Sequence, residues 1–190
     1  MNSLPPSPAE REKQLRLVRA RAQPKNQAKA PDRWPIFLEV VVGGVAWCTR
    51  EDLIGRLKNR DRLRNTEAEQ VEKAIRCPGF KITTGRQDLK LALATPKELG
   101  LHDGGFLRDI YKKAAGFDLV LLPVDTGPLT ILQVHTNWTK HGSIVIASEP
   151  VVIEDGRKLL FDVSNSRLRV LTGESDHYWG PTQPFLFRRL

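Results

Sequence analysis

The sequence contains only two cysteines, Cys48 and Cys77, among its 190 residues. Two distant cysteines cannot build a disulfide framework, and the sequence has no CxxC pair with the spacing of a zinc site. We therefore expect both thiols to be reduced, the state that the cytoplasm maintains. This absence excludes a disulfide-stapled secreted domain.

Long apolar runs are also missing. No stretch approaches the roughly 18 consecutive apolar residues that a membrane-spanning helix needs. The best candidate, "PIFLEVVVGGVAW", contains Glu39 and two glycines. The first residues, "MNSLPPSPAEREK", lack the basic start and apolar stretch of a secretory signal. We expect a chain of the cytoplasm without membrane contact.

The sequence lacks the glycine pattern of a phosphate-binding loop. Such a loop needs glycines at set spacings after a strand, so that several backbone N–H groups converge on one anion. "HDGGFLR" offers one glycine pair after a loop, so Gly104 and Gly105 predict the start of a helix instead. No Gly-x-Ser-x-Gly elbow and no HExxH pair is present. We expect no cofactor and no metal, and the sequence leaves open whether the protein is an enzyme.

Positive charge is what the sequence has in excess, and it is unevenly placed. The net charge is +8, and residues 1–33 hold eight basic and three acidic residues, which leaves +3 for residues 34–190. Prolines interrupt any helix after residue 23. We predict a basic N-terminal arm over 1–33, disordered or partly helical, and a single domain over 34–190. Within the arm, the candidate contacts are Arg16, Arg19 and Arg21.

A second basic stretch lies in "GRLKNRDRLRN", which we predict to connect two helices. It carries Arg56, Lys58, Arg60, Arg62 and Arg64 against the single acid Asp61. Lysine and arginine groups that contact phosphates make binding strongly salt-dependent, so both basic segments indicate a polyanionic partner. Two alternatives stay open: a solubilising arm, and a connection paired with Glu67 and Glu69. The tryptophans Trp47, Trp138 and Trp179 are predicted either to stack on bases or to pack at the core edge.

The pattern of apolar residues predicts an α+β fold: a mainly antiparallel sheet with a few helices packed on one face. "IFLEVVV" is rich in β-branched residues and reads as a strand. Thr49 and Thr66 are helix-capping candidates. Further strands are expected near 80–84, 88–94, 129–135, 143–153, 158–163, 167–172 and 184–188. Asp155-Gly156 predicts a hairpin turn.

Three residues form the best candidate reactive group. If 129–135 and 143–153 paired as a hairpin, His135 would approach His141, with Glu149 farther along the ladder. A His/His/Glu set can hold a metal or perform acid–base chemistry. Glu149 is also an acid inside an apolar run, where an inward orientation would raise its pKa and an outward one would leave it solvated.

Residues 97–163 contain a series of short motifs in a fixed order: Glu98-Leu99-Gly100, Ile110-Tyr111, Pro123, Gly127-Pro128, Gln133, Ile146-Ala147, Glu149-Pro150, Asp155-Gly156, Phe161 and Val163. In this pattern the segment resembles a family of small bacterial proteins without an assigned activity. The chain departs from the pattern at Val124-Asp125-Thr126 and at Thr130-Ile131. The resemblance implies a shared fold unit and a bacterial origin, and it implies no mechanism.

The function that the sequence favours is a non-enzymatic cytoplasmic binding protein. It would contact an acidic partner, most simply nucleic acid or else an acidic protein, through the arm and residues 56–64. One alternative is a small hydrolase or nuclease-type toxin that uses His135, His141 and Glu149. A third class is a protein-interaction module of the immunity or antitoxin kind. The sequence does not set the oligomeric state.

Overall fold

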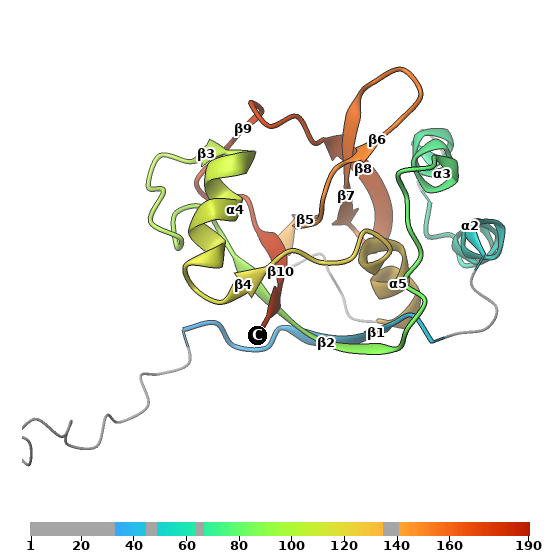
Figure 1. The fold of residues 1–190 in the computed structure, drawn as a ribbon, viewed down its shortest axis with the longest axis horizontal. Helices are drawn as coiled ribbons and strands as arrows, with labels where there is room; N and C mark the ends of the chain where they lie inside the picture. Colours follow the sequence, from blue (N-terminus) through green and yellow to red (C-terminus); the bar gives the residue numbers. More distant parts are fainter. Residues whose placement is uncertain (1–32, 45–48, 64–66, 135–140) are drawn as a thin grey trace, which may run out of the picture. The chain divides into compact units, whose positions relative to one another are not determined.

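A computed structural model describes residues 33–44, 49–63, 67–134 and 141–190. The chain divides into two units, Met1–Arg33 and Trp34–Leu190, and the helices and strands described all belong to the second. The helices are α2 (Arg50–Asn59), α3 (Ala68–Arg76), α4 (Leu107–Ala115) and α5 (Thr126–Gln133) (Figure 1). The strands are β1 (Leu38–Val42), β2 (Gln87–Ala94), β3 (Gly105–Phe106), β4 (Leu119–Val120), β5 (Ser143–Ile146), β6 (Val151–Val152), β7 (Lys158–Ser164), β8 (Arg167–Thr172), β9 (Tyr178–Trp179) and β10 (Phe185–Arg189).

One large sheet organises the domain. Its strands follow the order β1-β2-β10-β5-β7-β6, with β4 beside β10 and β8 beside β7. Among the described strands the pairings are antiparallel except that of β10 with β5. A separate two-stranded sheet joins β3 to β9. The predicted α+β class with a mainly antiparallel sheet is therefore confirmed.

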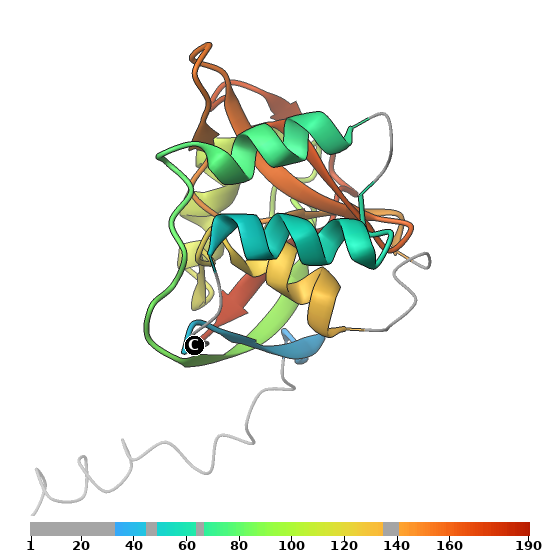
Figure 2. The same ribbon diagram turned by 90° about the vertical axis from the view of Figure 1, so that its right-hand side faces the viewer.

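Alternate residues of the central strands face opposite sides of this sheet, because side chains alternate along a strand. In β10, Leu186 joins one buried cluster, whereas Phe185 and Phe187 join the other. The first cluster lies under α2, α3 and α5, which Figures 1 and 2 show on the same side. The second cluster lies under α4.

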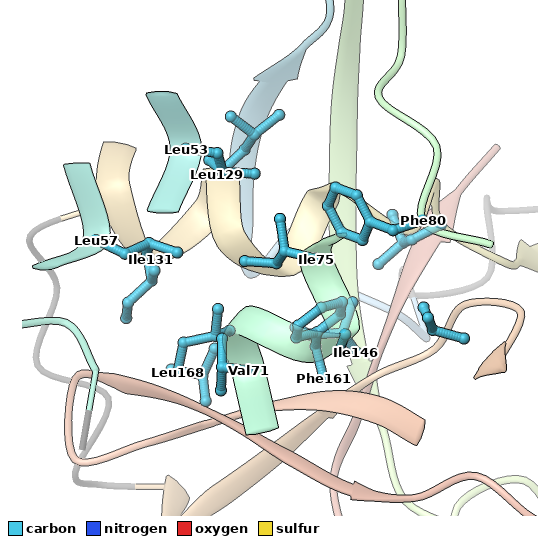
Figure 3. Close-up of a cluster of buried hydrophobic side chains, with 14 of the residues drawn as sticks. Leu53, Leu57, Val71, Ile75, Phe80, Leu129, Ile131, Ile146, Phe161 and Leu168 are labelled. Carbon is cyan, nitrogen blue, oxygen red and sulfur yellow. The ribbon is translucent and has the colours of Figure 1, made fainter. Parts of the chain in front are cut away.

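The first cluster is the larger of the two cores (Figure 3). The helices contribute four fully buried side chains to it, Leu53 and Leu57 of α2 and Val71 and Ile75 of α3. Phe161 of β7 meets Phe80 edge to face, with ring centroids 5.8 Å apart. Burial of an aliphatic or aromatic side chain of this size stabilises the fold by about 1.5–3 kcal/mol.

The beginning of α2 follows the predicted capping chemistry. Thr49 Oγ1 accepts the backbone N–H of Asp52 at 3.1 Å, and the Asp52 carboxylate accepts the backbone N–H of Thr49 at 3.1 Å. These reciprocal bonds satisfy two backbone donors that a helix start leaves without partners. The predicted hairpin turn at Asp155-Gly156 is also confirmed, since Gly156 has φ +84° and the turn joins β6 to β7.

The predicted strand 129–135 is wrong where the structure describes it. Residues 126–133 form α5, with Pro128 in the first turn, where proline is tolerated. Most of α5 is buried, and Gly127 fits so tightly that an added Cβ would lie 2.9 Å from Phe161 Cβ. A helix that is apolar on nearly all sides shows no amphipathic period, which is why its sequence reads as a strand.

Two further expectations are corrected. Residues 81–84 form no regular strand, and the Thr83 N–H bonds to the Asp125 carboxylate instead of a neighbouring strand. The helix predicted at Gly104-Gly105 begins at Leu107, because Gly105 and Phe106 pair with β9 first.

Candidate nucleic-acid interface

Of the predicted basic residues in 56–64, the structure places Arg56, Lys58 and Arg60 in α2 or at its C-terminus instead of in a connecting loop. Arg56 and Lys58 lie within the helix, and Arg60 caps its C-terminus. Arg62 follows in the chain toward α3. Arg16, Arg19, Arg21 and Arg64 lie outside the described residues.

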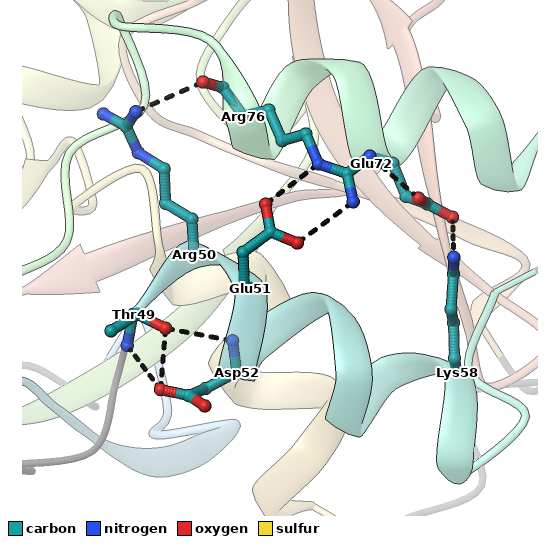
Figure 4. A network of polar contacts seen from close by, with 7 residues as sticks. All are labelled: Thr49, Arg50, Glu51, Asp52, Lys58, Glu72 and Arg76. Atoms are coloured by element: carbon teal, nitrogen blue, oxygen red, sulfur yellow. Dashed lines mark hydrogen bonds and ion pairs between the residues drawn. The ribbon is translucent and has the colours of Figure 1, made fainter.

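Lys58 joins α2 to α3 through a chain of ion pairs, in which the Glu72 side chain is mostly buried (Figure 4). Its ammonium group lies 2.7 Å from Glu72, and Glu72 also contacts Arg76 of the same helix at 3.0 Å. Arg76 in turn binds Glu51, and this hydrogen bond holds the pKa of the Glu51 carboxyl below its usual value. The charge of Lys58 is therefore compensated by a carboxylate.

Arg60 is held by a neutral oxygen. Its Nη1 atom donates to the main-chain carbonyl of Leu132 at 2.7 Å, at the end of α5. Beside this contact lies a small hollow of about 170 Å³, which Arg56 and Gln133 also line. A carbonyl orients the guanidinium without cancelling its charge, and four of its five N–H donors stay available.

Arg62 is fixed in a similar way on the turn between β7 and β8. Its Nη1 atom donates to the carbonyl of Ser166 at 3.2 Å, and its own carbonyl accepts the N–H of Leu168 at 2.7 Å. The side chain is half-buried. Nearby, Asp61 pairs with Arg167 at 2.8 Å.

These residues make a positively charged surface that we call the basic end of α2. It comprises Arg56, Lys58, Arg60, Arg62 and Arg167, next to the acids Asp61 and Glu72. Lys58 and Arg167 meet these two acids, whereas no described carboxylate lies within 4.0 Å of Arg60 or Arg62. Of the acids expected to neutralise this stretch, Glu69 pairs with Lys73 inside α3. The arrangement presents oriented cations and suits the binding of an anion.

The predicted His/His/Glu group does not form through the expected hairpin. His135 lies outside the described residues. His141 precedes β5 and meets the ring of Phe37 edge to face at 5.2 Å, whereas Glu149 follows the other end of β5. In the described part of the chain, no three His, Cys, Asp or Glu side chains are grouped for a metal.

Glu149 points outward, as one of the two expectations had it. It is exposed and lies between two hollows of about 340 and 360 Å³ that share Pro150. Beside it, the Tyr111 hydroxyl donates to the carbonyl of Ser148 at 2.9 Å. Burial, with the nearby charge of Glu149, raises the pKa of this hydroxyl, so Tyr111 is a neutral donor rather than a base.

Two buried carboxylates were not anticipated from the sequence. Asp125 accepts the N–H and the hydroxyl of Thr83 at 2.8 and 2.9 Å. Asp162 binds Arg169 at 2.5 Å and accepts a hydrogen bond from the Ser143 hydroxyl. Desolvation raises the pKa of both carboxyls. The only signal for them in the sequence is that each acid interrupts an apolar run. Both carboxylates are bound by neighbouring side chains of the fold, so we assign them a role in stabilising it.

Of the three tryptophans predicted as candidates for base stacking, the structure describes only Trp179. Trp47 and Trp138 lie outside the described residues. Trp179 is only 5% exposed and packs on Phe185 with ring centroids 5.2 Å apart, so it belongs to the core edge. Its neighbour Tyr178 is 51% exposed, so of these two aromatic residues Tyr178 is the one that solvent reaches.

No helix in the described ranges is long and apolar enough to cross a membrane. The chain matches no protein-family model, no curated protein and no solved structure. The resemblance over residues 97–163 therefore stays a prediction.

Proposed function

We propose that this chain is a non-enzymatic binding protein of the cytoplasm whose partner is a polyanion, most simply nucleic acid. The contacts are made by the arm over 1–33 and by the basic end of α2. The arm has a net charge of +5, which is known from its sequence. The folded domain contributes cations whose positions are set by hydrogen bonds.

The observation that carries the proposal is the anchoring of Arg60 and Arg62 on main-chain carbonyls. Guanidinium groups that pair with carboxylates have little charge to offer a phosphate. Groups that are held by carbonyls keep their charge, and the hydrogen bond lowers the entropy lost when an anion binds. Arginine also matches phosphate geometry through two parallel N–H bonds.

The test compares two pairs of neutralised arginines in the full-length protein. Arg60→Gln with Arg62→Gln removes two charges, and the glutamine amide is still a donor for the carbonyls. The control, Arg86→Gln with Arg157→Gln, removes two exposed arginines that pair with Asp88 and Asp155. Binding to a duplex DNA and a duplex RNA is titrated at low and moderate salt.

The first pair is expected to weaken binding about tenfold or more and to lower the salt slope by nearly two, since each phosphate contact contributes about 0.9. The control pair should change affinity less than about threefold. Equal losses in both pairs would mean that net charge alone governs binding, which would remove the basic end of α2 as the site. Denaturation curves confirm that each variant is folded.

A further inference from the structure

The side of the domain that carries α4 holds a different kind of surface. An open hollow of about 650 Å³ lies beside α4, β3 and β9, and its lining includes three aromatic rings and two lysines. Figure 1 shows α4 and α2 at opposite sides of the domain. This hollow is therefore separate from the basic end of α2.

Its aromatic edge is formed by Phe106 and Tyr178, which are directly paired across β3 and β9. Their rings meet edge to face with centroids 5.5 Å apart, and they are 37% and 51% exposed. Alternation along β9 turns Trp179 into the core and Tyr178 outward. Because the two rings are in contact, they form one exposed aromatic patch, and contiguous exposed patches of this kind can mark binding sites.

The two rings are held in place by the backbone around them. The Tyr178 hydroxyl donates to the carbonyl of Asp103 at 2.9 Å. Gly104 has φ +106°, and an added Cβ would lie 2.3 Å from the carbonyl oxygen of Trp179, so the loop and β9 are in close contact. An aromatic surface that is already ordered loses little entropy when a flat ligand stacks on it.

Positively charged side chains line the same hollow as these aromatic rings. Lys112 and Lys113 in the last turn of α4 line the hollow, together with a single acid, Asp109. Asp109 lies 3.8 Å from Arg108, and the Arg108 guanidinium lies 5.7 Å from the centroid of the Phe106 ring. No carboxylate of the described ranges lies within 4.0 Å of either lysine. The hollow thus combines two partly exposed aromatic rings with a surplus of positive charge.

We infer that this hollow binds single-stranded nucleic acid, with bases stacked at Phe106 and Tyr178 and phosphates near Lys112 and Lys113. Stacking on aromatic side chains beside a basic groove is the usual means of binding single strands without sequence preference. A duplex cannot use this site, because its bases already stack on one another. The inference rests on the proposed function and makes it more specific, since it names the form of nucleic acid.

The test uses the full-length protein, a 20-nucleotide single strand, and the duplex of the same sequence. Phe106→Leu with Tyr178→Leu retains apolar bulk and removes both π-faces. Tyr178→Phe retains the ring and loses only the hydroxyl. Val152→Ala alters another exposed apolar residue, 49% exposed, outside this hollow.

The double leucine variant should bind the single strand at least about tenfold more weakly than the wild type, given typical losses per stacked base. Its duplex affinity should change less than about twofold. Val152→Ala should match the wild type on both ligands. Tyr178→Phe keeps the ring but loses the hydrogen bond to Asp103, so it should weaken single-strand binding slightly, and far less than the double leucine variant does. Unchanged single-strand affinity in the double leucine variant would overturn the inference and leave the proposed function standing.

A wild-type protein that binds neither ligand would overturn the proposed function and this inference together. If the double leucine variant is unfolded, Lys112→Gln with Lys113→Gln takes its place, because both lysines are exposed on α4. That variant should weaken single-strand binding and reduce its salt slope by nearly two. A single-strand affinity and slope equal to those of the wild type would contradict the site.

Discussion

The side-chain amide of Gln133 forms two hydrogen bonds with the backbone of Val41, as a neighbouring strand would. The Val41 N–H donates to Gln133 Oε1 at 3.1 Å, and Gln133 Nε2 donates to the Val41 carbonyl at 2.6 Å. β1 is the first strand of the sheet order, and its outer edge would otherwise be open at Val41. Open edge groups can template pairing with another chain, so α5 protects the sheet here.

Replacing Gln133 with alanine should lower the free energy of unfolding by about 1–2 kcal/mol, because two hydrogen bonds are lost. The control is Gln70→Ala on the exposed side of α3, where a surface substitution should stay within about 0.5 kcal/mol. Urea denaturation with an unchanged slope measures both values. Equal stability of the two variants would show that the Gln133 contact contributes nothing.

Two glycines in helices should respond oppositely to alanine. At Gly127 in α5 the new Cβ would lie 2.9 Å from Phe161 Cβ and 3.2 Å from Ile146, so we expect a loss of about 1–3 kcal/mol from overpacking. At Gly55 in α2 no atom lies within 4 Å of the new Cβ, and alanine should add about 0.5–1 kcal/mol through helix propensity. Thermal or urea unfolding of the two variants checks the signs. A tolerated Gly127→Ala would mean that α5 is not packed closely on β7.

Asp125 should make the protein gain stability on acidification. Desolvation raises the pKa of this carboxyl above its ordinary value near 3.8, so between the two values the folded state holds the proton and the unfolded state does not. Stability from this group therefore falls as pH rises through the window and is recovered as pH falls.

Asp125→Asn removes this titration and provides the comparison. The stability of the wild type relative to the variant should rise as pH falls through the raised pKa of the folded state, and it should level off below the ordinary value near 3.8. Unfolding free energies of both proteins at several pH values measure it. The opposite trend, with the wild type gaining as pH rises, would show that Thr83 lowers the pKa more than burial raises it.

Much of the fold is predictable from local sequence patterns. The alternation of Leu89 and Leu91 with polar residues marks β2, and the Thr49–Asp52 spacing marks the start of α2. These signals involve residues within a few positions of each other. The helix α5 cannot be predicted in this way for two reasons. Its burial on nearly all sides comes from tertiary packing, and its glycine, proline and β-branched residues do not favour a helix.

The candidate site is predictable in composition but not in geometry. Sequence alone indicates a cluster of cations over 56–64. It does not show that Arg60 meets Leu132 or that Arg62 meets Ser166, since these partners are 72 and 104 residues away. It also does not distinguish Tyr178 from Trp179, because the choice of outward residue depends on the pairing of β9 with β3.

Binding to a polyanion is tested most directly by measuring the affinity of the full-length protein for duplex nucleic acid over a series of salt concentrations from about 50 to 300 mM. If Arg16, Arg19, Arg21, Arg60 and Arg62 each contact a phosphate of a duplex, the logarithm of the binding constant should fall with the logarithm of salt at a slope of about −4.5. Absence of binding at the lowest salt, or an affinity that does not change across the series, would contradict it.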